Sequence, residues 1–346
     1  MKHTQILKRS WDILWGYRAM WVFGIILALT SASATGGSGG HGGGGGDGGH
    51  GAMYNHPAQY RMELSEMRTG LQELFRHGVR VDVEPWIIWL AVGLAVLALL
   101  LAVVFTIGHF VSRVAMIRMV DGYETNGEKL TWKQGFRLGW SRAAWRLFLI
   151  NLLILLAVIA AFAVLFGLAA LPAILTFNAG EALMVMGMVV TAGLSIPLAL
   201  LAIVTVVVIS LAMETIRRVC VLGEHGVLDS IRLGWKMVRG NLKDVGLMWL
   251  LTLGIQFGLV LLLIPLVIAL LGGGLALGGG FGLLLYLAVQ ALSNATAGWI
   301  TAAIGGIVVL ITTLAIPLTF VDGLKETYLS SAWTLTYREL SKVESQ

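Results

Sequence analysis

Metal-binding side chains gather in one glycine-rich segment of the chain. His41, Asp47, His50 and His56 lie in or just after residues 36–51, which hold twelve glycines. Imidazole and carboxylate groups are typical ligands of zinc or copper. Closing a site on so many glycines costs conformational entropy that no preformed structure offsets. We therefore interpret this segment as a flexible linker and predict no cofactor, with an outer-face metal-binding sensor as the alternative.

Three further ionisable residues lie near the ends of long apolar runs. His109, Glu214 and Asp322 are candidates for a polar site because ionisable groups inside membrane helices often serve a function. If the three runs surround a common axis, these side chains face one another and bind a cation or relay protons. The alternative is that they pair with basic neighbours at the membrane surface, namely Arg113, Arg217, Arg218 and Lys325.

The composition is that of a membrane protein. Of the 346 residues, 57% are apolar and 12% are charged, and the mean hydropathy is +0.84, outside the range of soluble domains. A membrane-spanning helix needs about 20 apolar residues. The apolar runs predict an all-α fold with six transmembrane helices, at about 18–34, 86–112, 146–171, 184–213, 245–270 and 298–321.

The basic residues alternate between the loops in a way that predicts topology. Twenty of the 24 Lys and Arg residues fall in alternate loops and at the two ends, and the other four lie in the loop 35–85. Because positive charge is enriched on the cytoplasmic side, both termini are predicted to be cytoplasmic and this loop to lie outside. The basic residues then contact anionic lipid headgroups on the cytoplasmic side, and no nucleic-acid partner is predicted.

A tryptophan-containing pattern recurs along the chain. "FRLGWSRAAWRL" at 136–147 matches "IRLGWKMVRGNL" at 231–242, and weaker copies contain Trp11 and Trp333. The first three copies each lead into an apolar run, which predicts three helical hairpins, each preceded by a basic amphipathic interfacial helix. The predicted units are 1–122, 130–225 and 226–325, followed by a cytoplasmic amphipathic helix at about 325–346.

The two best copies favour contact with lipid headgroups. In each copy apolar residues recur at helical intervals, and basic residues lie on a separate face of the helix. Such helices lie in the headgroup layer, with tryptophan at the boundary and basic side chains on phosphate. The predicted headgroup contacts are Arg137, Arg142, Arg232, Lys236, Arg239 and Lys243.

Two segments leave alternatives open. Residues 272–296 are apolar but rich in glycine, so a re-entrant turn and close helix packing through Gly274 and Gly278 fit them equally well. The residues up to Ala34 imitate a signal peptide with an A-x-A cleavage site, Ala32-Ser33-Ala34. We favour a retained first helix, because Trp11 belongs to the recurring pattern.

Segments such as "KRSWDILW" and "FRLGWSRAAW" before each hairpin resemble the YciC-like bacterial membrane proteins and the related membrane domain of some glycerophosphodiester phosphodiesterases. The resemblance covers most of the chain. It implies a polytopic α-helical protein of the bacterial inner membrane, and it implies no catalytic residues. The long loop 35–85 departs from the compact pattern of that group.

The sequence contains no recognisable catalytic motif. It has no Ser/His/Asp arrangement, no H-E-x-x-H and no phosphate-binding G-x-x-x-x-G-K-[ST]. We therefore predict a nonenzymatic inner-membrane protein that acts as a lipid-associated envelope scaffold or as a subunit of a larger membrane complex with another membrane protein. The alternative is a small-molecule or lipid transporter, suggested by the internal repeat and the three ionisable residues.

Overall fold

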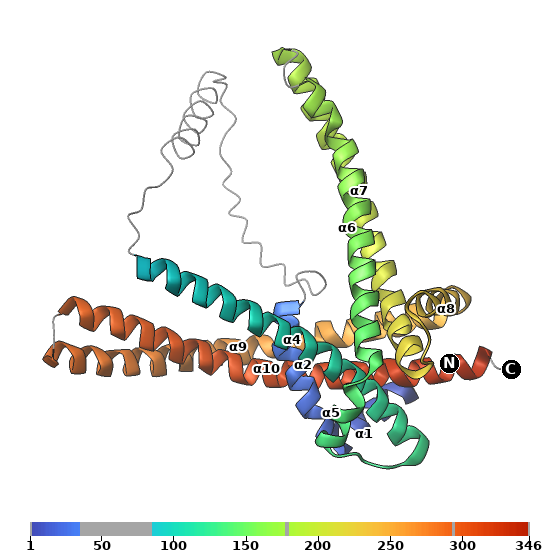
Figure 1. Ribbon diagram of the computed structural model, residues 1–346, viewed down its shortest axis with the longest axis horizontal. Helices are drawn as coiled ribbons and strands as arrows, with labels where there is room; N and C mark the ends of the chain where they lie inside the picture. The colour runs from blue at the N-terminus through green and yellow to red at the C-terminus, as the bar shows by residue number, and fades with distance from the viewer. Residues whose placement is uncertain (1, 35–84, 177–179, 293–294, 345–346) are drawn as a thin grey trace. The chain divides into compact units, whose positions relative to one another are not determined.

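The computed structural model describes residues 2–34, 85–176, 180–292 and 295–344 (Figure 1). All elements in these residues are α-helices, and they occupy all six positions predicted to span the membrane, so the all-α prediction is confirmed. The helices are α1 (His3–Gly16), α2 (Ala19–Ala34), α4 (Pro85–Asn126), α5 (Trp132–Gly139), α6 (Arg142–Thr176), α7 (Glu181–Leu222), α8 (Val227–Gly240), α9 (Leu242–Leu292) and α10 (Ala295–Glu344).

Five of these helices are long and apolar enough to cross a membrane: α4, α6, α7, α9 and α10. A sixth span results if α1 and α2 count together, although the chain bends by 100° between them. In each of the five, at most 17% of the most apolar window is buried within the described chain. The apolar side chains of these windows therefore require lipid or another protein to cover them.

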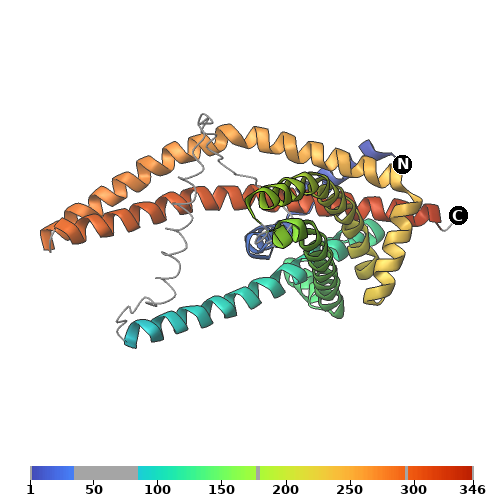
Figure 2. The ribbon, with the colours of Figure 1, turned by 90° about the horizontal axis from the view of Figure 1, so that it is seen from above.

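Contacts divide the chain into two units, residues 1–34 with 105–346, and residues 35–104. The described part of the second unit is the first half of α4, residues 85–104. Its large apolar side chains are exposed, including Trp89 at 75%. In the first unit, α6 and α7 form one antiparallel hairpin, and α9 and α10 form another (Figures 1 and 2).

The buried core of the first unit lies where the basic segments meet the ends of the apolar runs. One cluster joins α1 and α2 to the last turns of α4 and α10, and includes Met20, Phe23 and Met116. The other joins α4, α6 and α7, and includes Ile150 and Ile216. We call this region the base: residues 3–30, 109–150, 211–252 and 322–344.

Helix α10 forms the centre of the base. Small polar side chains on its second half are buried, and most donate a hydrogen bond to the carbonyl four residues earlier, as Thr334 does to Ser330 at 2.7 Å. The expected boundary near residue 325, where a separate surface helix was predicted to begin, is absent: α10 continues unbroken to Glu344. Because α1, α2 and α9 pack around residues 322–344, this segment is a core helix.

The closest helix crossing joins α2 to α10 through two glycines. A Cβ atom added to Gly24 would overlap with the carbonyl oxygen of Gly323, and one added to Gly323 would lie 2.8 Å from the backbone nitrogen of Ile25. Only glycine permits backbones to approach this closely. The crossing fixes the first apolar helix against the central helix of the base.

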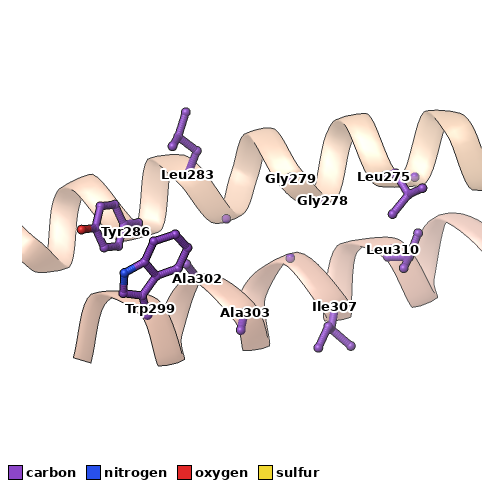
Figure 3. A pocket seen from close by; sticks show the side chains of 13 residues that line it. Leu275, Gly278, Gly279, Leu283, Tyr286, Trp299, Ala302, Ala303, Ile307 and Leu310 are labelled. Carbon is purple, nitrogen blue, oxygen red and sulfur yellow. The ribbon is translucent and has the colours of Figure 1, made fainter. Parts of the chain in front are cut away.

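The glycine-rich segment continues α9 as a helix as far as Leu292, so the re-entrant interpretation of residues 272–292 is wrong. Gly274, Gly278 and Gly282 face α10, where a Cβ on Gly278 would lie 2.6 Å from the carbonyl oxygen of Gly306. Because these residues are small, the backbones of α9 and α10 contact each other directly. This close packing favours a continuous helix over a turn. The packing leaves a shallow groove of about 430 Å³ between the helices (Figure 3).

Two adjacent glycines of α9 allow a direct test of this packing. Gly278 is buried against Gly306, whereas Gly279 has no neighbour within 4 Å of an added Cβ (Figure 3). We expect Gly278→Val to lower the stability of the hairpin by about 1–3 kcal/mol, because the side chain must push the backbones apart. Gly279→Val is the matched control and should leave it nearly unchanged. Limited proteolysis and thermal denaturation in detergent measure the stability of both variants. Equal stability of the two variants would contradict close packing at Gly278.

Candidate lipid-contact surface and charged cluster

One of the two best copies of the tryptophan pattern lies on α8, and the other begins at the end of α5 and continues through Trp140 into the start of α6. In each, the glycine before tryptophan faces the base, and a Cβ on Gly139 would overlap with the carbonyl oxygen of Val111. A Cβ on Gly234 would lie 2.9 Å from the Cα atom of Ile216. The tryptophans that follow are exposed, Trp140 at 62% and Trp235 at 45%. The glycine therefore docks the helix and directs the indole ring outward.

The weaker copies share the buried small residue but not the exposed ring. Ser10 and Ala332 are fully buried, and each precedes a tryptophan in the sequence. Trp11 is 54% exposed, similar to Trp140 and Trp235, whereas Trp333 lies in the core and is only 5% exposed. The sequence comparison matches Gly139 to Gly234 but does not reveal that this position is buried. The available signal is that a small residue precedes the tryptophan in all four copies.

Two arginines anchor the turn that positions α8. Arg146 of α6 donates to the backbone carbonyls of Glu224 and His225 at 2.7 and 3.2 Å, and Arg118 of α4 contacts the carboxylate of Glu224 at 3.3 Å. Glu224 adopts a positive φ of 52°, a conformation in which non-glycine residues are uncommon. The turn between α7 and α8 is thus tied to two other helices of the base.

The six residues predicted to contact headgroups lie on α5, α8 and the first turns of α6 and α9. All six are exposed, and within the described part of the chain none has a hydrogen bond or ion pair. Several basic residues nearby are instead held by carboxylates, such as Arg9 by Glu124 at 2.8 Å. The available cations are Arg137, Arg142, Arg232, Lys236, Arg239 and Lys243.

His109, Glu214 and Asp322 each have a separate partner. Nδ1 of buried His109 lies 3.2 Å from the hydroxyl of Thr30 on α2. No direct contact joins the three residues among the residues that the structure describes. The predicted polar site of three facing side chains is therefore not assembled by direct contact.

The two carboxylates are held by cations on their own helices. Glu214 accepts hydrogen bonds from Arg217 at 2.9 Å and from Arg218, and Asp322 accepts one from Lys325. Arg218 also reaches across from α7 to α10, with Nη2 3.4 Å from the carbonyl oxygen of Ser330. Both carboxylates therefore pair with basic neighbours, as the alternative interpretation of the sequence predicted.

The metal-site candidates His41, Asp47, His50 and His56 lie outside the described residues. In the described ranges, no group of three or more His, Cys, Asp or Glu side chains is arranged to hold a metal ion.

Comparison with known proteins identifies a family but no characterised relative. Residues 10–336 match the model of a family of unknown function, DUF7544. No curated protein and no solved structure matches the chain.

Proposed function

We propose that this chain, which belongs to the DUF7544 family of unknown function, is a nonenzymatic membrane protein that organises lipid at the cytoplasmic face of the inner membrane. The observation that carries the proposal is the exposed surface of α5 and α8, where cations without a partner among the described residues lie beside exposed tryptophan rings. An anionic headgroup supplies the missing charge, and indole rings prefer the level of the headgroups.

The helices that form this surface are held rigidly enough to act as a platform. Gly139 and Gly234 dock α5 and α8 on the base, and Arg118 and Arg146 fix the turn before α8. A preformed surface loses less conformational entropy on binding than a flexible basic segment. The base therefore acts as a scaffold, with the apolar helices as its anchors in the bilayer. The resemblance to YciC-like membrane proteins agrees with this role and stays a prediction.

Neutralising the cations of α8 and the start of α9 tests the proposal. Each basic residue near an anionic surface contributes about 1 kcal/mol, so removal of four should weaken binding of phosphatidylglycerol by up to about a thousandfold. The full chain is purified in mild detergent, and bound phosphatidylglycerol and phosphatidylethanolamine are measured by mass spectrometry. The variant combines Arg232→Gln, Lys236→Gln, Arg239→Gln and Lys243→Gln.

The control carries the same change in charge on the loop predicted to lie outside. It combines Arg61→Gln, Arg68→Gln, Arg76→Gln and Arg80→Gln. We expect this control to keep the preference of the wild-type chain for phosphatidylglycerol. If both variants lose the preference equally, or if neither does, the surface of α5 and α8 is not the lipid platform.

Transport of a small molecule or lipid is the alternative function, and an outer-face metal sensor is the second. The transport hypothesis rests on the internal repeat and on His109, Glu214 and Asp322, each of which has its own partner. The sensor hypothesis rests on residues outside the described ranges. The scaffold role is supported better because its six residues are exposed and available.

A further inference from the structure

A charged cluster lies where α4, α7 and α10 pack together, beyond the apolar run of each helix. Its members are the first charged residues beyond these apolar runs, together with the charged residues one turn further on. It contains four cations and three carboxylates, so one positive charge is in excess. The members are Arg113, Glu214, Arg217, Arg218, Asp322, Lys325 and Glu326.

The pairing within the cluster leaves Arg113 as the excess cation. Glu214 accepts from both Arg217 and Arg218, and Lys325 lies between Asp322 and Glu326, 4.0 Å from the latter. Arg113 is half-buried, and among the described residues it has no ion pair or hydrogen bond. Val111 and Val114, which flank Arg113 on α4, pack in one buried cluster with Met213 and Ile216, which flank Glu214 on α7. A guanidinium in this position lacks a direct counter-ion.

Two polar atoms, one in the cluster and one beside it, are buried without a partner among the described residues. Nε of Arg218 and Oγ of Ser330 have no hydrogen bond to any described residue, although Arg218 is only 3% and Ser330 only 9% exposed. The two residues are adjacent, because Nη2 of Arg218 lies 3.4 Å from the carbonyl oxygen of Ser330. Buried polar atoms are almost always hydrogen-bonded, and both of these groups can donate. Both groups therefore lack a hydrogen-bond acceptor.

We propose that the charged cluster binds one phosphate group, with Arg113 as its counter-ion and with Arg218 and Ser330 as additional donors. An excess positive charge disfavours a cation, and unused guanidinium donors match the geometry of phosphate oxygens. The cluster begins where the apolar runs end, which is the level of lipid phosphates in a bilayer. The phosphate belongs either to a lipid headgroup or to a soluble phosphate, and both present the same oxygens.

This site differs from the proposed platform on α5 and α8 in a measurable way. The platform consists of exposed cations spread over four helices and should bind several headgroups, whereas the cluster lies where three helices pack together and should hold one phosphate. Binding at the cluster should therefore saturate at one phosphate per chain. It should also survive the removal of the four α8 and α9 cations, so the two proposals can fail separately.

The experiment measures binding to the purified full chain in mild detergent by native mass spectrometry and by the shift in unfolding temperature. One arm adds inorganic phosphate. The other adds short-chain phosphatidylglycerol to the chain whose four α8 and α9 cations are replaced by glutamine, so that platform binding does not contribute. We expect one saturable adduct in at least one arm, and the arm that gives it identifies the source of the phosphate. In Arg113→Gln the affinity should fall at least tenfold. This variant should fold normally, because Arg113 takes part in no ion pair of the described structure.

Two further variants keep the result interpretable. Ser330→Ala removes one donor and should weaken the single adduct by a smaller factor. Lys8→Gln removes an exposed cation of α1 that belongs to neither the cluster nor the platform, and it should leave the adduct unchanged. Absence of a saturable adduct in both arms overturns the proposal. So does an adduct of wild-type affinity in the Arg113→Gln chain.

Discussion

Replacing Glu214 by glutamine is expected to reduce the free energy of unfolding of the base by about 3 kcal/mol, because it leaves two inward-facing arginines without their carboxylate. Arg218 is 3% exposed and Arg217 is 17% exposed in their side chains, so water replaces little of the lost interaction. Glutamine keeps one acceptor oxygen but removes the negative charge. Thermal denaturation of the purified chain in detergent should show a clearly lower unfolding temperature.

Glu224→Gln provides the matched control for this substitution. Glu224 also pairs with an arginine, Arg118 at 3.3 Å, but its side chain is 77% exposed. Exposed ion pairs contribute about 0–1 kcal/mol, so the control should change the unfolding temperature little. If both substitutions have the same small effect, the interactions of Glu214 do not hold α7 in the base.

Gly24→Val is the second substitution for which we expect a large effect. The added side chain would overlap with the carbonyl oxygen of Gly323 and with the hydroxyl of Thr327. Neither can move far, because the carbonyl belongs to α10 and Thr327 is fully buried. Overpacking of a core costs about 1–3 kcal/mol, and backbone contact puts this site at or above the upper end. We expect reduced yield of folded protein and a lower unfolding temperature.

Gly167→Val is the control that measures the effect of valine on a helix without any clash. Gly167 of α6 has nothing within 4 Å of an added Cβ, and valine has a higher helix propensity than glycine. Gly167→Val should therefore be neutral or slightly stabilising. A neutral Gly24→Val variant would mean that α2 and α10 do not cross at these glycines.

The positions of the helices follow from the sequence because each needs only local information. The charge-free stretch 245–321 and the shorter apolar runs predict helices in a membrane, and helices occupy these positions. The pairs Glu214 with Arg217 and Asp322 with Lys325 are also local. Their spacing of three residues places the side chains on one helix face.

The features that depend on a neighbouring helix could not be derived in this way. Whether the glycines of residues 272–282 form a turn or a helix depends on the small residues opposite them, such as Gly306 on α10. The extension of α10 beyond residue 325 likewise depends on the helices that bury its serine and threonine side chains. A single sequence gives no information about which helices lie side by side.

The buried Trp333 distinguishes the last copy of the tryptophan pattern from the three before it. Trp11, Trp140 and Trp235 keep their indole rings at the surface. Trp333 lies on the second half of α10, and its ring is in the core instead. The same short motif thus has two environments, depending on whether it lies at the edge of the base or on its central helix. Substitutions that enlarge or charge the ring position should be tolerated in three copies and rejected in the fourth.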